Sequence, residues 1–303
     1  MSGRLPDFLI IGAQKAGTTT LYRDLETHPQ IAFSYHKEPH CLCFDRVLTA
    51  RGRREYEGYF SKIGPEQICG DASTGYTKIP EWTGVPKRAM AVLGDDVRLI
   101  YIVRNPVDRA VSHHHHVFSE GLMPASFDEA LERDERLIAF GKYAMQAEAW
   151  LEVYPAGKLR IIVFEEYLKR RRETIAELQE FLGVAPKPEL VDPESRFNAA
   201  DQRLAMRGLL REITRSSLYS RTVRRWTGPA LRGRIAATLG LAHKAPARPA
   251  PPRPESVERL LEATRADQAR LMQLLGRTAP VWDEQATRQR WQAAATRATP
   301  SPA

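Results

Sequence analysis

The sequence predicts an α/β fold in which a central parallel sheet of about five strands lies between layers of helices, with a helical appendage in the C-terminal part of the chain. Apolar runs, several of them rich in β-branched residues, occur at residues 8–13, 67–72, 97–103 and 159–164. Helical periodicity or loops separate these runs, which is typical of buried strands that pair in parallel and are covered on both faces. With 43% hydrophobic and 27% charged residues, the 303-residue chain has the composition of a globular protein that buries a full core.

Helices are expected between and after these strands. The segment after the first run has helical periodicity and ends before Pro29. Ser126 and Glu129 form a capping box that starts a helix over residues 126–136. Further helical patterns cover residues 143–154, 165–182 and 256–275.

The elements form one predicted domain over residues 1–285, with its α/β core at about residues 5–195. A basic helical segment follows at about residues 200–244, and a proline-rich connection at residues 245–254 joins it to the last predicted helix. The tail at residues 286–303 has no apolar stripe, and we expect it to be disordered.

The composition and the N-terminal sequence indicate the cellular compartment of the protein. No stretch approaches 18 consecutive apolar residues, and the N-terminus runs into the first strand without a signal-peptide pattern. The cysteines Cys41, Cys43 and Cys69 are too few for a disulfide framework. These features predict a cytoplasmic protein without a membrane span, and the Ala- and Arg-rich composition favours a bacterial source.

Positive charge is concentrated in one segment. The net charge is +8, but residues 203–253 alone hold twelve Lys or Arg and one acid, Glu212. Arginines alternate with apolar residues over residues 203–244, so this segment can pack on the core, form a lid over an anionic or lipid-like substrate, or contact a membrane peripherally. Its aromatic residues, Tyr219 and Trp226, are too few for nucleic-acid stacking, and no nucleic-acid partner is expected. The sequence does not define an oligomeric state.

A glycine-bearing loop follows the first strand. Residues 12–19, GAQKAGTT, have the glycine spacing of the Walker A pattern GxxxxGK[ST] and lie between a strand and a helix. Main-chain N–H groups in such a loop, together with the helix N-terminus, bind phosphate. Thr18 occupies the position of the Walker lysine, and Lys15 comes three residues earlier. Because the Walker lysine contacts the β- and γ-phosphates, its absence argues against a nucleoside triphosphate and favours a 5′-phosphate with a shorter extension.

A second phosphate site is predicted after the third apolar run, which leads into Arg104. A P-loop nucleotidase places a Mg²⁺-binding aspartate at this point. The Arg104 guanidinium and the Ser112 hydroxyl instead offer a bidentate fork and a hydrogen-bonding hydroxyl to a phosphate. The sequence therefore predicts a P-loop-like fold with two monophosphate sites and no metal site.

The two phosphate motifs resemble those of sulfotransferases. FLIIGAQKAGTTTL is similar to the family's 5′-phosphosulfate loop, and IVRNPVDRAVS is similar to its 3′-phosphate motif. The resemblance extends over about residues 6–283 and is to the heparan-like and bacterial branch. It implies metal-free transfer of a sulfuryl group from 3′-phosphoadenosine 5′-phosphosulfate to a hydroxyl of a small molecule, glycan or lipid, with adenosine 3′,5′-bisphosphate as the product.

The resemblance also assigns roles to residues. Lys15 would stabilise charge on the leaving phosphate oxygen, and Glu38 would act as the general base with His40 beside it. The heparan-type lysine and proline are replaced here by Ala72 and Thr74, which weakens the inference of polysaccharide binding. The expected donor-binding residues, the last of them a neighbour of the site, are Lys15, Ala16, Gly17, Thr18, Thr19, Arg104, Ser112 and Tyr143.

Two other functions stay open at this point. Mg²⁺-dependent ATP binding would indicate a P-loop kinase-like phosphotransferase. Salt-sensitive nucleic-acid binding that is unaffected by Arg104→Ala would indicate a non-enzymatic basic protein. The four histidines at residues 113–116 lie on an expected helix and point in different directions, so they predict no metal site, although one of them could face the donor or acceptor.

Overall fold

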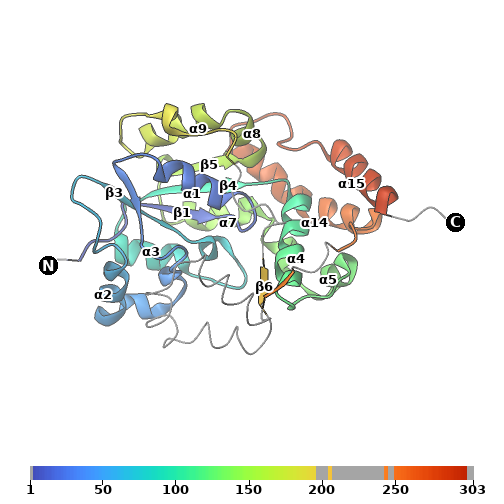
Figure 1. The fold of residues 1–303 in the computed structure, drawn as a ribbon, viewed down its shortest axis with the longest axis horizontal. Coiled ribbons are helices and arrows are strands. Elements are labelled where there is room, and N and C mark those ends of the chain that lie inside the picture. The colour runs from blue at the N-terminus through green and yellow to red at the C-terminus, as the bar shows by residue number, and fades with distance from the viewer. Residues whose placement is uncertain (1–2, 196–203, 207–241, 245–248, 299–303) are drawn as a thin grey trace.

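The computed structural model describes residues 3–195, 204–206, 242–244 and 249–298. Its main strands are β1 (Phe8–Gly12), β2 (Ile31–Phe33), β3 (Ile68–Ala72), β4 (Arg98–Val103) and β5 (Leu159–Val163). They form one sheet in the order β2–β3–β1–β4–β5, and every neighbouring pair is parallel (Figure 1). The predicted α/β fold with a parallel sheet of about five strands is confirmed.

Helices cover both faces of the sheet (Figure 1). Phe8 and Ile10 of β1 pack on one face, against helices α1 (Thr18–Glu26), α8 (Phe164–Lys169) and α9 (Arg171–Phe181). Leu9 and Ile11 pack on the other face, against α2 (Ala50–Gly58), α3 (Val85–Leu93) and α7 (Tyr143–Leu151). Because successive side chains of a strand point to opposite faces, a strand covered on both sides is apolar throughout.

The remaining elements surround this sandwich. The further helices are α4 (Pro106–Ser119), α5 (Phe127–Arg133), α6 (Arg136–Ala139), α14 (Pro254–Leu274) and α15 (Glu284–Ala298). Helices α4, α5, α6 and α14 share a third apolar cluster. Short 3₁₀ turns lie at Cys41–Cys43, Asp45–Leu48, Thr74–Thr77, Ala156–Lys158 and Pro188–Leu190.

Helix boundaries follow the local signals in the sequence. Ser126 caps α5 as predicted, because its Oγ accepts a hydrogen bond from the Glu129 N–H at 3.3 Å. The helix predicted over residues 165–182 is divided into α8 and α9 at Arg170, whose backbone (φ −124°, ψ 49°) is not helical. Helix α14 corresponds to the helix predicted over residues 256–275.

The C-terminal tail differs from the prediction. The sequence predicts disorder at residues 286–303, but the chain is helical up to Ala298. The prediction is wrong because α15 is held largely by polar contacts, which leave no apolar stripe in the sequence. Arg288 pairs with Glu258 at 2.6 Å, and two further side chains of α15 contact α4.

Most of the basic segment lies outside the described residues, so the helical lid expected at about residues 200–244 stays a prediction. Its two ends are described as short strands, β6 (Leu204–Met206) and β7 (Ala242–Lys244), which pair antiparallel. The two ends of this segment therefore lie side by side. Within the described ranges, none of the helices combines the length and the apolar character needed to cross a bilayer.

Candidate active site

A cavity of about 570 Å³ lies where the segments that follow the five parallel strands come together. Carboxyl ends of parallel strands share one edge of a sheet, and ligands of α/β proteins bind there. The cavity is lined by residues from the segments after β1, β2, β3, β4 and β5. Of the residues predicted from the sequence, it brings together Lys15, Gly17, Thr18, Thr19, Glu38, Arg104 and Ser112.

The loop after β1 presents the N-terminus of α1 to this cavity. Gly17 caps the helix with a left-handed backbone (φ 98°), and a Cβ at this position would lie 2.4 Å from the Phe164 ring. Helical hydrogen bonding begins with Thr20, whose N–H donates to the Gly17 carbonyl at 3.0 Å. The N–H groups of Thr18 and Thr19 precede this bond, in the turn whose donors a helix leaves without intrahelical acceptors. This geometry favours binding of an anion.

The end of β4 brings Arg104 to the same cavity. Its Nη1 donates to the Lys15 carbonyl at 3.3 Å, so the two predicted phosphate sites are in direct contact. The guanidinium carbon lies 5.2 Å from the centroid of the Phe164 ring, within the range of a cation–π interaction. Ser112, on α4, lines the cavity as well. The guanidinium and the hydroxyl thus border one space, as the sequence predicts.

Glu38 lies in the segment after β2 and is held on one of its oxygens. Its Oε2 accepts a hydrogen bond from Thr74 Oγ1 at 3.0 Å and lies 3.3 Å from His40 Nε2, whereas Oε1 lies 3.5 Å from Lys37 Nζ. Burial by itself raises the pKa of Glu38, but the hydrogen bond from His40, the charge of Lys37 and the Thr74 hydroxyl outweigh it and lower the pKa to about 2. Glu38 is therefore ionised at neutral pH, with Oε1 the less engaged oxygen.

His40 contacts Glu38 but does not line the cavity. Its Nε2 faces the carboxylate, and its Nδ1 is buried with no hydrogen-bond partner among the described residues. A Cβ on Gly75 would lie 2.6 Å from that Nδ1, so the glycine makes room for the imidazole ring. The backbone N–H of His40 donates to Ser73 Oγ at 3.1 Å. The contacts place His40 behind Glu38.

Three residues of this region have an uncommon backbone conformation. Among the residues that the structure describes, Lys15 (φ 67°), Glu38 (φ 59°) and His40 (φ 54°) are the non-glycine residues with positive φ. Each such residue costs on the order of 1–3 kcal/mol, and strain of this kind concentrates at functional sites. The three are also the residues to which the sequence resemblance gives a catalytic role.

Two predicted donor-binding residues do not line the cavity. Ala16 is fully buried, and its N–H donates to the Ala13 carbonyl at 3.2 Å within the loop. Tyr143 is also fully buried, and its hydroxyl donates to the Arg104 carbonyl at 2.6 Å. Tyr143 therefore holds the main chain that carries Arg104.

The four consecutive histidines point in different directions, as their helical position predicts. His113 is buried, and burial together with the Arg109 charge lowers its pKa to about 2. His114 Nε2 lies 2.8 Å from the Pro124 carbonyl oxygen. His116 lines the candidate cavity. In the described part of the chain, no three His, Cys, Asp or Glu side chains gather in the way a metal ion requires.

The comparison with protein families decides between the functions left open by the sequence. The model of the sulfotransferase domain matches residues 5–202, about two thirds of the chain. The chain belongs to this family. The resemblance to sulfotransferases seen in the sequence is confirmed.

Related proteins agree with this membership. The sulfotransferase is 28% identical over 202 residues to the bovine (Bos taurus) bifunctional heparan sulfate N-deacetylase/N-sulfotransferase 2, covering 60% of this chain and 22% of that protein. It is 29% identical over 204 residues to mouse (Mus musculus) heparan sulfate glucosamine 3-O-sulfotransferase 6, covering 65% and 57%. It thus spans only part of the length of these relatives. The crystal structure of a sulfotransferase from Alicyclobacillus acidocaldarius shares the fold, with a TM-score of 0.59, 22% identity, and coverage of 95% of this chain and 99% of that one.

The sulfotransferase cavity also contains residues to which the sequence analysis gave no role. Lys37 Nζ donates to Thr19 Oγ1 at 2.8 Å and so connects the phosphate loop to the neighbouring Glu38. The Phe164 ring covers Gly17 and contacts the guanidinium of Arg104. The sequence positions of both residues indicate a place in the site, because Lys37 adjoins Glu38 and Phe164 directly follows β5.

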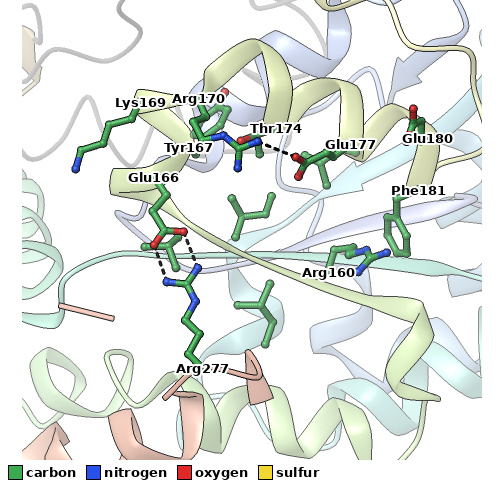
Figure 2. Close-up of a pocket in the computed structure, with 14 residues that line it drawn as sticks. Arg160, Glu166, Tyr167, Lys169, Arg170, Thr174, Glu177, Glu180, Phe181 and Arg277 are labelled. Carbon is green, nitrogen blue, oxygen red and sulfur yellow. Dashed lines mark hydrogen bonds and ion pairs between the residues drawn. The ribbon is translucent and has the colours of Figure 1, made fainter. Parts of the chain in front are cut away.

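A second, larger cavity of about 880 Å³ is lined by β5, α8 and α9 (Figure 2). Several of its charged side chains pair with one another, with Arg277 at 2.6 Å from Glu166 and Arg170 at 3.2 Å from Glu177 (Figure 2). It contains none of the residues predicted to bind donor or acceptor. The smaller cavity is therefore the candidate active site of the sulfotransferase.

Proposed function

We propose that the enzyme transfers the sulfuryl group of 3′-phosphoadenosine 5′-phosphosulfate to a hydroxyl of a small-molecule, glycan or lipid acceptor, in line and without a metal. The observation that carries this proposal is the pair of anion-binding groups in one cavity. The first turn of α1 and the Arg104 guanidinium both line it, and Arg104 contacts the main chain of Lys15 at 3.3 Å. A donor with a 5′-phosphate and a 3′-phosphate has one group for each.

The residues of the cavity fit this donor. Lys15, Arg23, Lys37 and Arg104 line it, and Glu38 is the one acid among the described lining residues. The excess of positive charge favours a polyanionic ligand. The left-handed glycine of the loop keeps the helix N-terminus free of a side chain, and the Phe164 ring holds the Arg104 guanidinium beside it.

Each residue has a defined task in this proposal. When bound, the donor supplies the sulfuryl group and departs as adenosine 3′,5′-bisphosphate. The N–H groups of Thr18 and Thr19 bind its 5′-phosphate, and the Lys15 ammonium stabilises the negative charge that develops on the leaving oxygen. Arg104 and Ser112 bind the 3′-phosphate and so fix the position of the donor.

Glu38 Oε1 takes the proton of the acceptor hydroxyl. A carboxylate with a pKa near 2 is a weak base, but the hydroxyl becomes acidic as its oxygen bonds to sulfur, so a weak base suffices late in the reaction. His40 is the less suitable base, because its Nε2 faces Glu38 and its Nδ1 is buried. His40 instead supports the carboxylate.

Glu38→Gln should lower kcat by about 10²-fold, near the lower end of the effect of general bases. The amide keeps the shape of the side chain but cannot take a proton at neutral pH. Affinity for adenosine 3′,5′-bisphosphate should stay within about twofold, because Glu38 has no part in phosphate binding. Steady-state kinetics and calorimetry measure the two quantities.

Glu55→Gln is a matched control, since Glu55 is another partly exposed carboxylate in ion pairs, on α2 outside the cavity. It should leave both quantities unchanged. Full activity of Glu38→Gln would move the base to His116, the histidine that lines the cavity. With a pKa of about 2, Glu38 stays ionised throughout pH 5–8 and loses its charge only as the pH falls toward 2. An inflection of the kcat profile between pH 5 and 8 would therefore belong to another group.

Calorimetry tests the donor itself. Binding of adenosine 3′,5′-bisphosphate in the presence of a chelator supports the proposal, since the cavity supplies its own cations. Mg²⁺-dependent binding of ATP without binding of the bisphosphate would contradict it and would favour a kinase-like phosphotransferase.

A further inference from the structure

The C-terminal segment of the chain reaches the turn that carries Arg104. Residues 282–291 contain the end of the loop before α15 and the first half of this helix, and they lie beyond the stretch that matches the family model. Three polar side chains of the Arg104 region, those of Asn105, Asp108 and Glu165, are hydrogen-bonded to this segment. The contacts converge on one short piece of main chain.

The peptide unit between Arg104 and Asn105 is held at both of its polar groups. Its carbonyl oxygen accepts a hydrogen bond from the Tyr143 hydroxyl at 2.6 Å, and its N–H donates to Glu165 Oε1 at 2.9 Å. Trp282 contacts both partners, because its indole N–H donates to Glu165 Oε2 at 2.9 Å and its ring lies 5.9 Å from that of Tyr143. A single buried side chain of the C-terminal segment thus supports both groups that hold this peptide.

Asn105 is fixed from the other side by α15. Its Oδ1 caps α4 by accepting the Val107 and Asp108 N–H groups at 3.0 and 3.3 Å. Its amide nitrogen donates to Thr287 Oγ1 at 2.9 Å, and that hydroxyl donates to the Asp283 carbonyl at 2.8 Å. Asn105 and Thr287 are 4% and 3% exposed, so the loss of this bond would leave a buried amide donor without a partner.

The first turn of α4 is tied to the same helix. Asp108 Oδ1 accepts hydrogen bonds from Arg290 Nη2 at 2.8 Å and from Trp291 Nε1 at 3.0 Å. Asp108 therefore anchors the start of α4, the helix that also carries Ser112. Both groups proposed to bind the 3′-phosphate are thus supported from the C-terminal segment.

We propose that Thr287 and Trp282 are positioning residues for the 3′-phosphate of the donor, acting through Asn105 and Glu165 on Arg104. The inference rests on the proposed donor. A guanidinium binds a phosphate bidentately only from a defined direction, and that direction follows from the main chain at its Cα. A fixed peptide unit after Arg104 reduces the ordering that binding would otherwise require, so it increases affinity.

The test compares adenosine 3′,5′-bisphosphate with adenosine 5′-monophosphate, which lacks the phosphate that Arg104 binds. In Thr287→Val, which removes the hydroxyl but preserves the shape, calorimetry should show threefold to tenfold weaker binding of the bisphosphate, on the order of one lost hydrogen bond. Affinity for the monophosphate should change by less than about twofold, because its site is formed by α1. Thr287→Ser should restore the bisphosphate affinity. Trp282→Phe, which removes the indole N–H, should repeat the selective loss.

Thr296→Val is the matched control, since Thr296 is an exposed threonine of α15 that bonds only within its helix in the described structure. It should leave both affinities unchanged. An equal loss for both nucleotides in Thr287→Val and in Trp282→Phe, or no loss in either, would overturn the positioning role. The donor proposal fails, and the positioning role with it, if the wild-type enzyme binds the two nucleotides equally tightly, or if Arg104→Ala still binds the bisphosphate more tightly than the monophosphate. A loss of affinity for the bisphosphate alone, which disappears when Arg104 is already replaced by alanine, supports both proposals.

Discussion

Replacing Arg104 with alanine should weaken the binding of adenosine 3′,5′-bisphosphate by about 2 to 4 kcal/mol, which corresponds to a 30- to 1,000-fold rise in Kd. The guanidinium is held against the phosphate loop by its bond to the Lys15 carbonyl and by the Phe164 ring. Its replacement removes a charge-assisted, bidentate contact that a neighbouring lysine cannot reproduce. Isothermal titration of the bisphosphate measures the effect, and adenosine 5′-monophosphate should show a much smaller one.

Arg160→Ala provides a matched control for this experiment. Arg160 lies on the neighbouring strand β5, and its guanidinium carbon is also 5.2 Å from an aromatic centroid, that of Phe181. It lines the larger cavity of Figure 2 instead of the candidate active site. Its replacement should leave nucleotide affinity unchanged. The reverse result, with loss of binding in Arg160→Ala and none in Arg104→Ala, would place the donor in the larger cavity.

Arg171→Met should lower the free energy of unfolding by about 3 to 5 kcal/mol, the cost of leaving a buried charge without its partner. Arg171 donates from Nε and Nη2 to the two carboxylate oxygens of Asp24 at 2.6 and 2.7 Å, and both side chains are 3% exposed. The Tyr167 hydroxyl donates to the same carboxylate. Because Asp24 lies on α1 and Arg171 on α9, the pair joins the phosphate-loop helix to the layer that covers the sheet. Urea unfolding followed by circular dichroism measures the loss.

Two further variants distinguish the effect of losing this buried ion pair from the effect of losing any surface charge. Arg170→Met removes the adjacent arginine, which pairs with Glu177 at the surface, where both side chains are 64% exposed. Such a pair contributes at most about 1 kcal/mol. The double variant Asp24→Leu, Arg171→Met should recover most of the stability, since no buried charge remains. Equal losses in Arg170→Met and Arg171→Met would contradict this account.

The sequence predicts which residues of the two phosphate motifs meet in one cavity, because their signals are local. Gly17, Thr18 and Arg104 belong to short motifs at strand ends, and a parallel sheet brings such ends to one edge. The left-handed backbone at Gly17 explains the glycine at this position, since only glycine adopts it without cost. The sheet is predicted from continuous apolar runs, because a strand that helices cover on both faces buries all of its side chains.

Contacts between segments that are far apart in the sequence cannot be predicted in this way. The role of Lys37 depends on the distance that joins it to Thr19 across two loops. Helix α15 has no apolar stripe, and the partners that hold it lie far away in the sequence, on α4 and α14. Polar tertiary contacts of this kind leave no periodic pattern, which is why the sequence does not predict the helix in the tail.

The left-handed main chain at residues 15, 38 and 40 lowers the stability of the fold in exchange for the side chains to which we assign the reaction. Glycine at these positions would relieve the strain and make the fold sturdier, but it would also delete the ammonium, the carboxylate and the imidazole. Variants of this protein with greater heat stability are therefore better sought among residues remote from the cavity than at these three positions.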